Sequence, residues 1–387
     1  MRFTRIGFFL LLGPLFASLI GAAPEPTSPA SGQIRTYYIA ADEVLWNYAP
    51  AGYNQMMGMP YGKIERAYAV RGANQIGPKY WKAIYREYTD GTFKHLKPRP
   101  ADQQYLGLLG PIIHAEVGDT IKVVFRNNAS HPYSIHPHGV LYTKANEGSG
   151  YNDGSNGQSM RGGAVAPGHI YTYTWQVPDR AGPGPEDPSS IVWFYHSHTE
   201  DQRDVDAGLV GAMIVTKAGM ARPDGTPKDV DREMINDYEI FDENQSWYLD
   251  RNMKAFAPKL GAKAKIEVLP FDEEGGSASL TGHGFADGNF KFSINGFIYG
   301  EGPQMVMRRG ERVRWYVISL GNGFNLHTPH WHGNTVLFQG HRTDVLNIGA
   351  AQMLEADMVP DNPGTWLVHC HYSDHMAGGM AALYKVL

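Results

Sequence analysis

The chain has 387 residues, a hydrophobic share of 42% and a formal net charge of -5 at pH 7. That length exceeds one ordinary hydrophobic core and predicts two domains, while the charge gives no electrostatic reason to expect nucleic acid as a partner. Frequent glycine, proline and tyrosine, without a long amphipathic helical pattern, favour an all-β fold.

Residues 1–23 have the pattern of a secretory signal peptide. Arg2 and Arg5 provide a basic start, residues 7–20 form a short apolar run, and small residues follow at 21–23. The apolar run is too short to cross a bilayer. We therefore expect a mature protein without a membrane span that is secreted or periplasmic.

Two motifs in the first half of the chain recur in the second half. The stretch WFYHSHTED, which starts at Trp193, matches WLVHCHYSD, which starts at Trp366, and SIHPHG likewise matches TPHWHG. In both halves a Gly-acid turn precedes a strand-like alternation of apolar and polar residues. The repeat predicts two β-domains, at 33–218 and 233–387, joined by a stretch rich in proline, glycine and charge.

Ten of the sixteen histidines fall in four clusters built around His-x-His. In a strand, residues i and i+2 point to the same face about 6.5 Å apart, so each such pair aims two imidazoles at one place. One pair alone is more often structural, but four clusters in two matching sets indicate metal binding. The ten are His136, His138, His196, His198, His327, His330, His332, His369, His371 and His375.

The only cysteine helps to choose the metal. Cys370 stands in a Cys-x4-His-x4-Met pattern with His375 and Met380. One thiolate, two imidazoles and a weak methionine form the ligand set of blue copper, whereas zinc sites more often recruit several cysteines. The pattern therefore favours copper, and His327 can supply the second imidazole.

The motifs HPHG, HSH, HTPHWHG and HCHYSDHMAGGM together resemble those of the multicopper oxidases, in the same order along the chain. YYIAADEVLWNYAP from Tyr37 and LGLLGPIIHAEVGDTI from Leu106 are similar to segments of ceruloplasmin, and the length is similar to that of two-domain laccases. The resemblance implies two cupredoxin-like β-sandwich domains with Greek-key topology. It also implies an enzyme that oxidises a reducing substrate at a type 1 copper and reduces O2 to water at a three-copper cluster.

The resemblance assigns a role to each ligand of the four copper ions implied per chain. Cys370 would hold the type 1 copper, and its neighbours His369 and His371 would hold two coppers of the oxygen site, so the backbone would carry electrons between them. The type 1 ligands would be His327, Cys370, His375 and Met380, and the type 2 ligands would be His136 and His330. The type 3 ligands would be His138, His196 and His371 for one copper and His198, His332 and His369 for the other.

The first half lacks a type 1 site. In the repeat Ser197 stands opposite Cys370, and a hydroxyl cannot replace a soft thiolate for blue copper. Each half would supply four of the eight histidines of the three-copper cluster, so the cluster must form between a first and a second domain. By analogy with two-domain relatives, we expect a homotrimer whose oxygen sites lie between subunits.

The sequence leaves alternatives open for the proton carrier, for the substrate and for the class of function. Asp201, which closely follows the His-x-His at 196–198, is a candidate proton carrier, although a solvated loop acid fits equally well. The substrate could be a phenol, an aromatic amine or a low-valent metal ion. A copper-containing nitrite reductase would need a type 1 site in the first domain, and a non-enzymatic copper-binding or electron-transfer protein would leave eight histidines unexplained.

Overall fold

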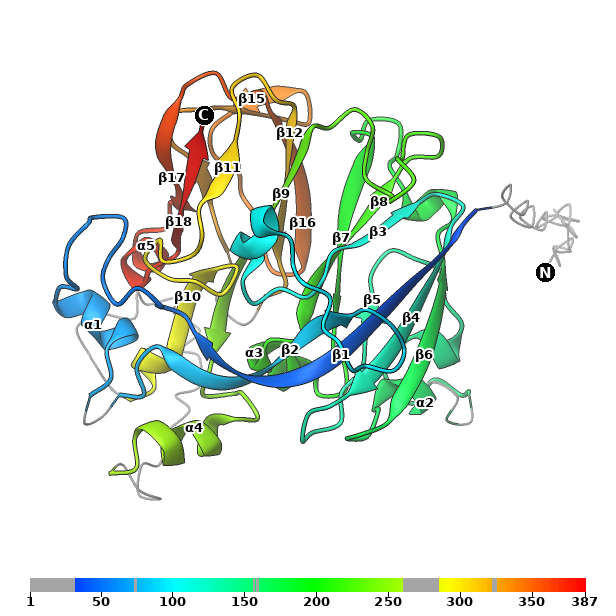
Figure 1. The fold of residues 1–387 in the computed structure, drawn as a ribbon, viewed down its shortest axis with the longest axis horizontal. Coiled ribbons are helices and arrows are strands. Elements are labelled where there is room, and N and C mark those ends of the chain that lie inside the picture. The colour runs from blue at the N-terminus through cyan, green and yellow to red at the C-terminus, as the bar shows by residue number, and fades with distance from the viewer. Residues whose placement is uncertain (1–31, 73–74, 156, 158–159, 260–284, 322–325) are drawn as a thin grey trace, which may run out of the picture.

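The structure, a computed structural model, describes residues 32–72, 75–155, 157, 160–259, 285–321 and 326–387. The segment predicted to be a signal peptide, residues 1–23, lies outside these described residues. Strands dominate the regular structure of the described residues and form four sheets there (Figure 1). The prediction of an all-β fold is therefore confirmed.

The first half of the chain forms two four-stranded sheets. Its strands are β1 (Ile34–Asn47), β2 (Lys79–Tyr88), β3 (Ile113–Glu116), β4 (Thr120–Asn127), β5 (His136–Pro137), β6 (Ile170–Gln176), β7 (Ser190–His196) and β8 (Val210–Thr216). One sheet has the order β2-β1-β4-β6 and the other has the order β3-β8-β7-β5. β4 buries Ile121, Val123 and Phe125 at alternate positions, because successive side chains of a strand point to opposite faces.

The second half forms a six-stranded and a four-stranded sheet. Its strands are β9 (Arg232–Asp242), β10 (Phe290–Ile294), β11 (Met305–Met307), β12 (Val313–Ser319), β13 (Pro329–Trp331), β14 (Val336–Phe338), β15 (His341–Thr343), β16 (Gln352–Met358), β17 (Gly364–Cys370) and β18 (Ala381–Val386). The orders are β10-β9-β12-β16-β14-β15 and β11-β18-β17-β13. Every residue of β12 is buried, and the strand belongs to a hydrophobic core cluster.

The helices are short. They are α1 (Lys63–Ala69), α2 (Met160–Gly163), α3 (Asp201–Ala207), α4 (Leu249–Phe256) and α5 (Ser373–Gly378), with 3-10 turns η1 (Ala101–Leu106), η2 (Lys144–Asn146), η3 (Asp179–Ala181) and η5 (Asp287–Asn289). α3 follows β7, and α5 follows β17. Both helices end at a glycine in the left-handed conformation, Gly208 and Gly379, which glycine adopts without strain. No helix among the described residues has the length and apolar character needed to cross a membrane.

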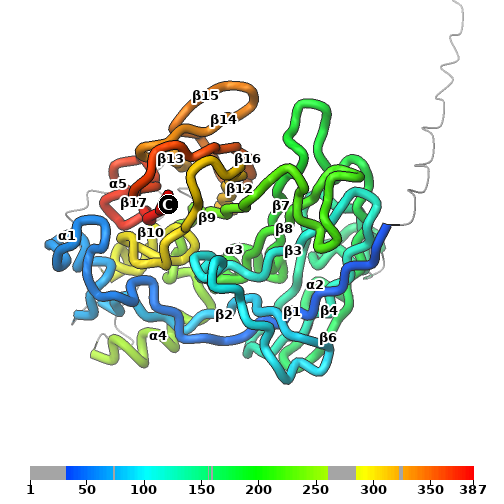
Figure 2. Tube along the Cα trace, turned by 45° about the horizontal axis from the view of Figure 1, so that its top comes forward, coloured from blue at the N-terminus to red at the C-terminus, as the bar shows by residue number. Residues whose placement is uncertain are grey.

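The two halves share a hydrophobic core, and Figures 1 and 2 show their sheets side by side. Phe194 and Ile214 from the first half belong to the same buried cluster as Trp315 and Val317 from the second. The chain after β1 also reaches across, and Figure 1 shows α1 beside α5. The predicted division into two domains, with a boundary at 218–233, stays a prediction.

Candidate metal centre

Four histidines of the first half converge on one place, and we call them the first-half cluster. β5 pairs with β7, which puts His136 directly opposite His196. His138 and His198 complete the cluster, and its ring centroids lie 5.1 to 5.5 Å apart. The Nε2 atoms of His138 and His196 are 3.3 Å apart.

The second half repeats this arrangement in the second-half cluster. β13 pairs with β17, which puts His330 opposite His369. The ring centroids of these two residues, His332 and His371 lie 4.7 to 5.5 Å apart, and the Nε2 atoms of His332 and His369 are 3.1 Å apart. Within the described residues no ring contact joins the two clusters. The described residues therefore hold two matching sets of four imidazoles that make no ring contact with each other.

Backbone carbonyl groups orient imidazoles in both clusters. Nδ1 of His136 lies 2.6 Å from the carbonyl oxygen of Glu147, and Nδ1 of His330 lies 2.9 Å from that of Asp344. Nδ1 of His369 lies 2.8 Å from the carbonyl oxygen of Cys370. An Nδ1–H donated to a carbonyl leaves the Nε2 lone pair free to bind a metal at the centre of the cluster.

A glycine after each His-x-His allows a tryptophan to pack against the turn. Gly139 and Gly333 have φ values of 77° and 73°. A Cβ atom would lie 2.3 Å from Trp193 at Gly139 and 2.4 Å from Trp366 at Gly333. The glycine and the tryptophan of the repeated motifs are therefore in contact, which explains why both recur.

Three further donor atoms form a buried group, which we call the sulfur site. Side-chain donor atoms of His327, Cys370 and His375 all lie within 4.8 Å of one another. Nδ1 of His375 is 3.2 Å from Nδ1 of His327 and 3.5 Å from the sulfur of Cys370. Buried Met380 is adjacent, because its carbonyl accepts the Cys370 N–H at 3.1 Å and its N–H donates to the His375 carbonyl at 2.9 Å.

Burial sets the protonation of these groups. Desolvation lowers the pKa of His138 and His327 to about 3 and that of His136 and His375 to about 4. Desolvation also raises the pKa of the Cys370 thiol. At neutral pH these four imidazoles are therefore ready to bind a metal, whereas the thiol must release a proton when the metal arrives.

The first-half counterpart of the sulfur site is a hydrogen-bonded polar network. Ser134 donates its N–H to the Ser197 hydroxyl at 3.0 Å, just as Thr328 donates its N–H to the Cys370 sulfur at 3.3 Å. The Ser197 hydroxyl in turn donates to the buried carboxylate of Asp204 at 2.7 Å. Ser197 therefore has a hydroxyl that already accepts one hydrogen bond and donates another, where Cys370 has its sulfur.

Asp201 lies at the first-half cluster. Its Oδ1 is 3.0 Å from Nδ1 of His196, and its side chain is 54% exposed. A cavity of about 540 Å³ opens here, lined by the four histidines, Asp201 and second-half residues that include Gly321 and Ala350. Asp201 therefore connects the cluster with solvent, which is the geometry that a proton carrier needs.

Sequence reasoning missed two residues of the site. Asp344 accepts Nδ1–H of His330 through its carbonyl, and its half-exposed carboxylate lies 4.0 Å from the same nitrogen. Tyr372 stacks on His375 with a centroid distance of 5.2 Å. Asp344 comes to the site through the β14–β15 hairpin and carries no local signal in the sequence, whereas the position of Tyr372 between two predicted ligands is such a signal.

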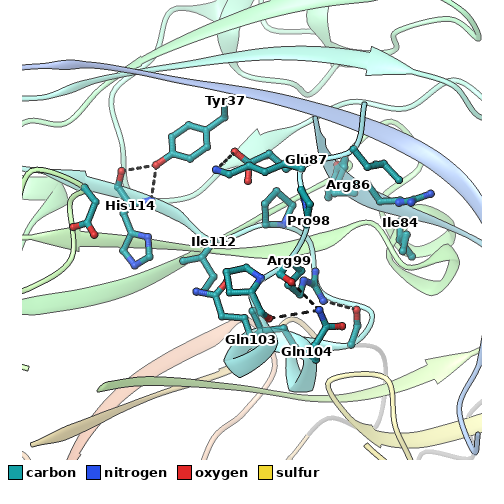
Figure 3. A pocket seen from close by; sticks show the side chains of 18 of the residues that line it. Tyr37, Ile84, Arg86, Glu87, Pro98, Arg99, Gln103, Gln104, Ile112 and His114 are labelled. Carbon is teal, nitrogen blue, oxygen red and sulfur yellow. Dashed lines mark hydrogen bonds and ion pairs between the residues drawn. The ribbon is translucent and has the colours of Figure 1, made fainter. Parts of the chain in front are cut away.

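A second cavity, of about 600 Å³, lies elsewhere (Figure 3). Its described lining residues include none of the ten predicted histidine ligands. The charged groups there are already paired: Lys97 with Glu87 at 2.9 Å, and Arg99 with the Gly107 carbonyl at 2.8 Å. We therefore assign no chemistry to this cavity.

Two family models, both described as multicopper oxidase, match residues 103–219 and 279–387. Ferroxidase HEPHL1 of Homo sapiens is 40% identical over 355 residues, which cover 91% of this chain and 29% of that protein. Ceruloplasmin of Mus musculus is 41% identical over 356 residues, which cover 91% of this chain and 32% of that protein. The chain therefore spans less than a third of the length of these relatives.

Solved structures show the same fold. The blue copper oxidase from Nitrosomonas europaea aligns with a TM-score of 0.53 and 18% identity, covering 92% of this chain and 86% of that one. At this identity the likeness concerns the fold alone. The predicted cupredoxin-like β-sandwich architecture is confirmed.

Proposed function

Since the chain belongs to the multicopper oxidase family, we propose that it couples the one-electron oxidation of a reducing substrate to the reduction of O2 to water. The observation that carries this proposal is the position of Cys370. It contributes to the sulfur site, while the next residue on each side, His369 and His371, belongs to the second-half cluster. Alternate side chains of a strand face opposite ways, so one peptide segment joins both places.

The donor atoms present fit copper. A buried thiolate, two imidazoles and a neighbouring methionine suit a type 1 copper, and eight imidazoles suit the other three ions. We assign the type 1 copper to His327, Cys370, His375 and Met380, and the type 2 copper to His136 and His330. The close Nε2 pairs support one type 3 copper at His138, His196 and His371, and another at His332, His369 and His198. When bound, the ions accept single electrons from the donor and transfer four electrons to O2.

The protein's own groups orient ligands, exclude water and handle protons. Burial of Cys370 and His327, each 0% exposed, keeps water from the sulfur site. Asp201 is the proposed proton carrier, because it contacts His196 and also reaches solvent. We count Cys370, His369, His371 and Asp201 as the residues through which electrons and protons reach the oxygen site.

The oxygen site would assemble between chains, and we propose a homotrimer. Each cluster of four histidines is half of the required set, and within the described residues of one chain no ring contact joins the two clusters. Exposed apolar side chains accompany them: Val345, 39% exposed, forms a β-bridge with His330, and Leu141, 43% exposed, closely follows His138. Such side chains suit burial against a neighbouring subunit.

The proposed donors are low-valent metal ions such as Fe(II), together with phenols or aromatic amines. The relative HEPHL1 is named a ferroxidase. The negative charge of Asp374 opposes the desolvation that lowers the pKa of His375, so a carboxylate lies near this ligand. A carboxylate at that place favours a cationic donor. The secretory pattern at residues 1–23 supports action outside the cytoplasm.

A copper-containing nitrite reductase fits less well, because the hydroxyl of Ser197 occupies the place of a first-half thiolate. An electron carrier would leave both histidine clusters without a role. The test is O2 uptake by copper-loaded protein with a phenol, Fe(II) and Cu(I) in parallel, using Cys370→Ser as the blank. We expect uptake that the variant loses almost completely. Equal uptake by the variant would exclude electron transfer through Cys370.

A further inference from the structure

We propose that Tyr372 is the docking surface for aromatic electron donors, so that a phenol or aromatic amine stacks on its ring to reach the sulfur site. The inference rests on the proposed function and adds to it the residue that selects one donor class. Tyr372 lies at the start of α5, between the second-half cluster and His375.

The proposed ligands of the sulfur site are buried. His327, Cys370 and Met380 are each 0% exposed, and His375 is 7% exposed. The ring of Tyr372 stacks on the His375 imidazole with a centroid distance of 5.2 Å and an interplanar angle of 30°, yet Tyr372 is 47% exposed. This ring therefore contacts the buried site and solvent at once.

Hydrogen bonds hold the backbone of Tyr372, which carries the ring. The carbonyl of Tyr372 accepts the N–H of Met376 at 3.0 Å in the first turn of α5. The backbone of Tyr372 also hydrogen-bonds to the Cys370 side chain. A ring held in this way loses little conformational entropy when a second ring stacks on it.

Aromatic rings attract each other in stacked or edge-on geometries, beyond what the area that they bury contributes. A phenol on Tyr372 would give one electron to the type 1 Cu(II) and its hydroxyl proton to water. An aquated metal ion has no ring to stack, and the carboxylate of Asp374, which precedes His375 in the chain, suits it better. The two donor classes should therefore differ in their need for Tyr372.

The experiment compares Tyr372→Ala and Tyr372→Phe in copper-loaded protein, with 2,6-dimethoxyphenol and Fe(II) as donors. We expect Tyr372→Ala to raise KM for the phenol about threefold to tenfold and to leave KM for Fe(II) unchanged, while Tyr372→Phe retains the original KM. Tyr53→Ala is the matched control, because Tyr53 is 43% exposed on the loop after β1.

A second readout needs no turnover. Paramagnetic relaxation by the type 1 Cu(II) should broaden the ring protons of benzyl alcohol in the original protein and in Tyr372→Phe, and should weaken in Tyr372→Ala. An unchanged phenol KM in Tyr372→Ala, or an equal loss for phenol and Fe(II), would overturn the inference. Failure of the proposed function would look different, because the original protein would then consume O2 with neither donor.

Discussion

Thr328 donates its backbone N–H to the sulfur of Cys370 at 3.3 Å, and its hydroxyl oxygen lies 3.8 Å from the same sulfur. A copper-bound thiolate has no proton, so the hydroxyl can only donate. Hydrogen bonds to the sulfur withdraw electron density from it and stabilise the reduced metal. Thr328→Val keeps the N–H and removes the hydroxyl.

We therefore expect Thr328→Val to lower the type 1 reduction potential by about 20 to 60 mV, which corresponds to the loss of one ordinary hydrogen bond. Redox titration of the blue absorption measures the shift. Thr328→Ser is the matched control and should keep the original potential. A potential that is unchanged in Thr328→Val would show that the hydroxyl makes no contribution.

Lys82 of β2 and Glu243, just after β9, form an ion pair with both side chains 0% exposed and an N···O distance of 2.5 Å. Removal of one partner leaves a buried charge without compensation. Lys82→Met should therefore lower the free energy of unfolding by about 3 to 5 kcal/mol in urea titrations. The double variant Lys82→Met/Glu243→Gln should recover much of that loss, and a double variant no more stable than the single one would argue against this explanation.

Glu355 of β16 accepts the N–H of Val192 in β7 at 2.7 Å, and burial raises its pKa to about 7. The folded state therefore binds the proton more tightly than the unfolded state, where the pKa is about 4.5. Stability from this group is complete below about pH 4.5 and is lost as the pH rises toward 7. Glu355→Gln keeps the acceptor oxygen and should raise stability at pH 8 by roughly 1 to 3 kcal/mol, with little change at pH 4. Thermal unfolding at both pH values tests this expectation.

Val345, which bridges to His330, is proposed to face a neighbouring subunit. A carboxylate there would be desolvated on assembly. Val345→Asp should therefore shift the protein toward monomers in analytical ultracentrifugation and lower its copper content, while the blue absorption of the sulfur site persists. Val306→Asp, at a residue that is equally exposed on β11, is the control. Trimers that persist in Val345→Asp would place the interface elsewhere.

The grouping of the histidines could be predicted from the sequence because strand geometry is local. A His-x-His with period 2 places both imidazoles on one face, and the repeat pairs His136 with His330 before any coordinates are known. The structure adds that β5–β7 and β13–β17 pair in matching register, so the same ring contacts occur twice.

The supporting residues could not be predicted because they depend on tertiary contacts. Asp344 reaches His330 only after the chain has turned through β14 and β15. Asp204 reaches Ser197 because α3 folds back over the strand end. The shared core between the halves could not be predicted either, since Phe194 and Trp315 are 121 positions apart in the sequence and belong to one buried cluster only once the sheets have packed.

Copper content per chain, measured together with absorption at about 600 nm, tests the central claim most directly. The original protein should bind four copper ions per chain and be blue. Cys370→Ser should bind three and be colourless, because only the sulfur site loses its thiolate. A colourless original protein that is fully loaded, or one that binds a single copper per chain, would contradict the assignment of the sulfur site and of the two histidine clusters.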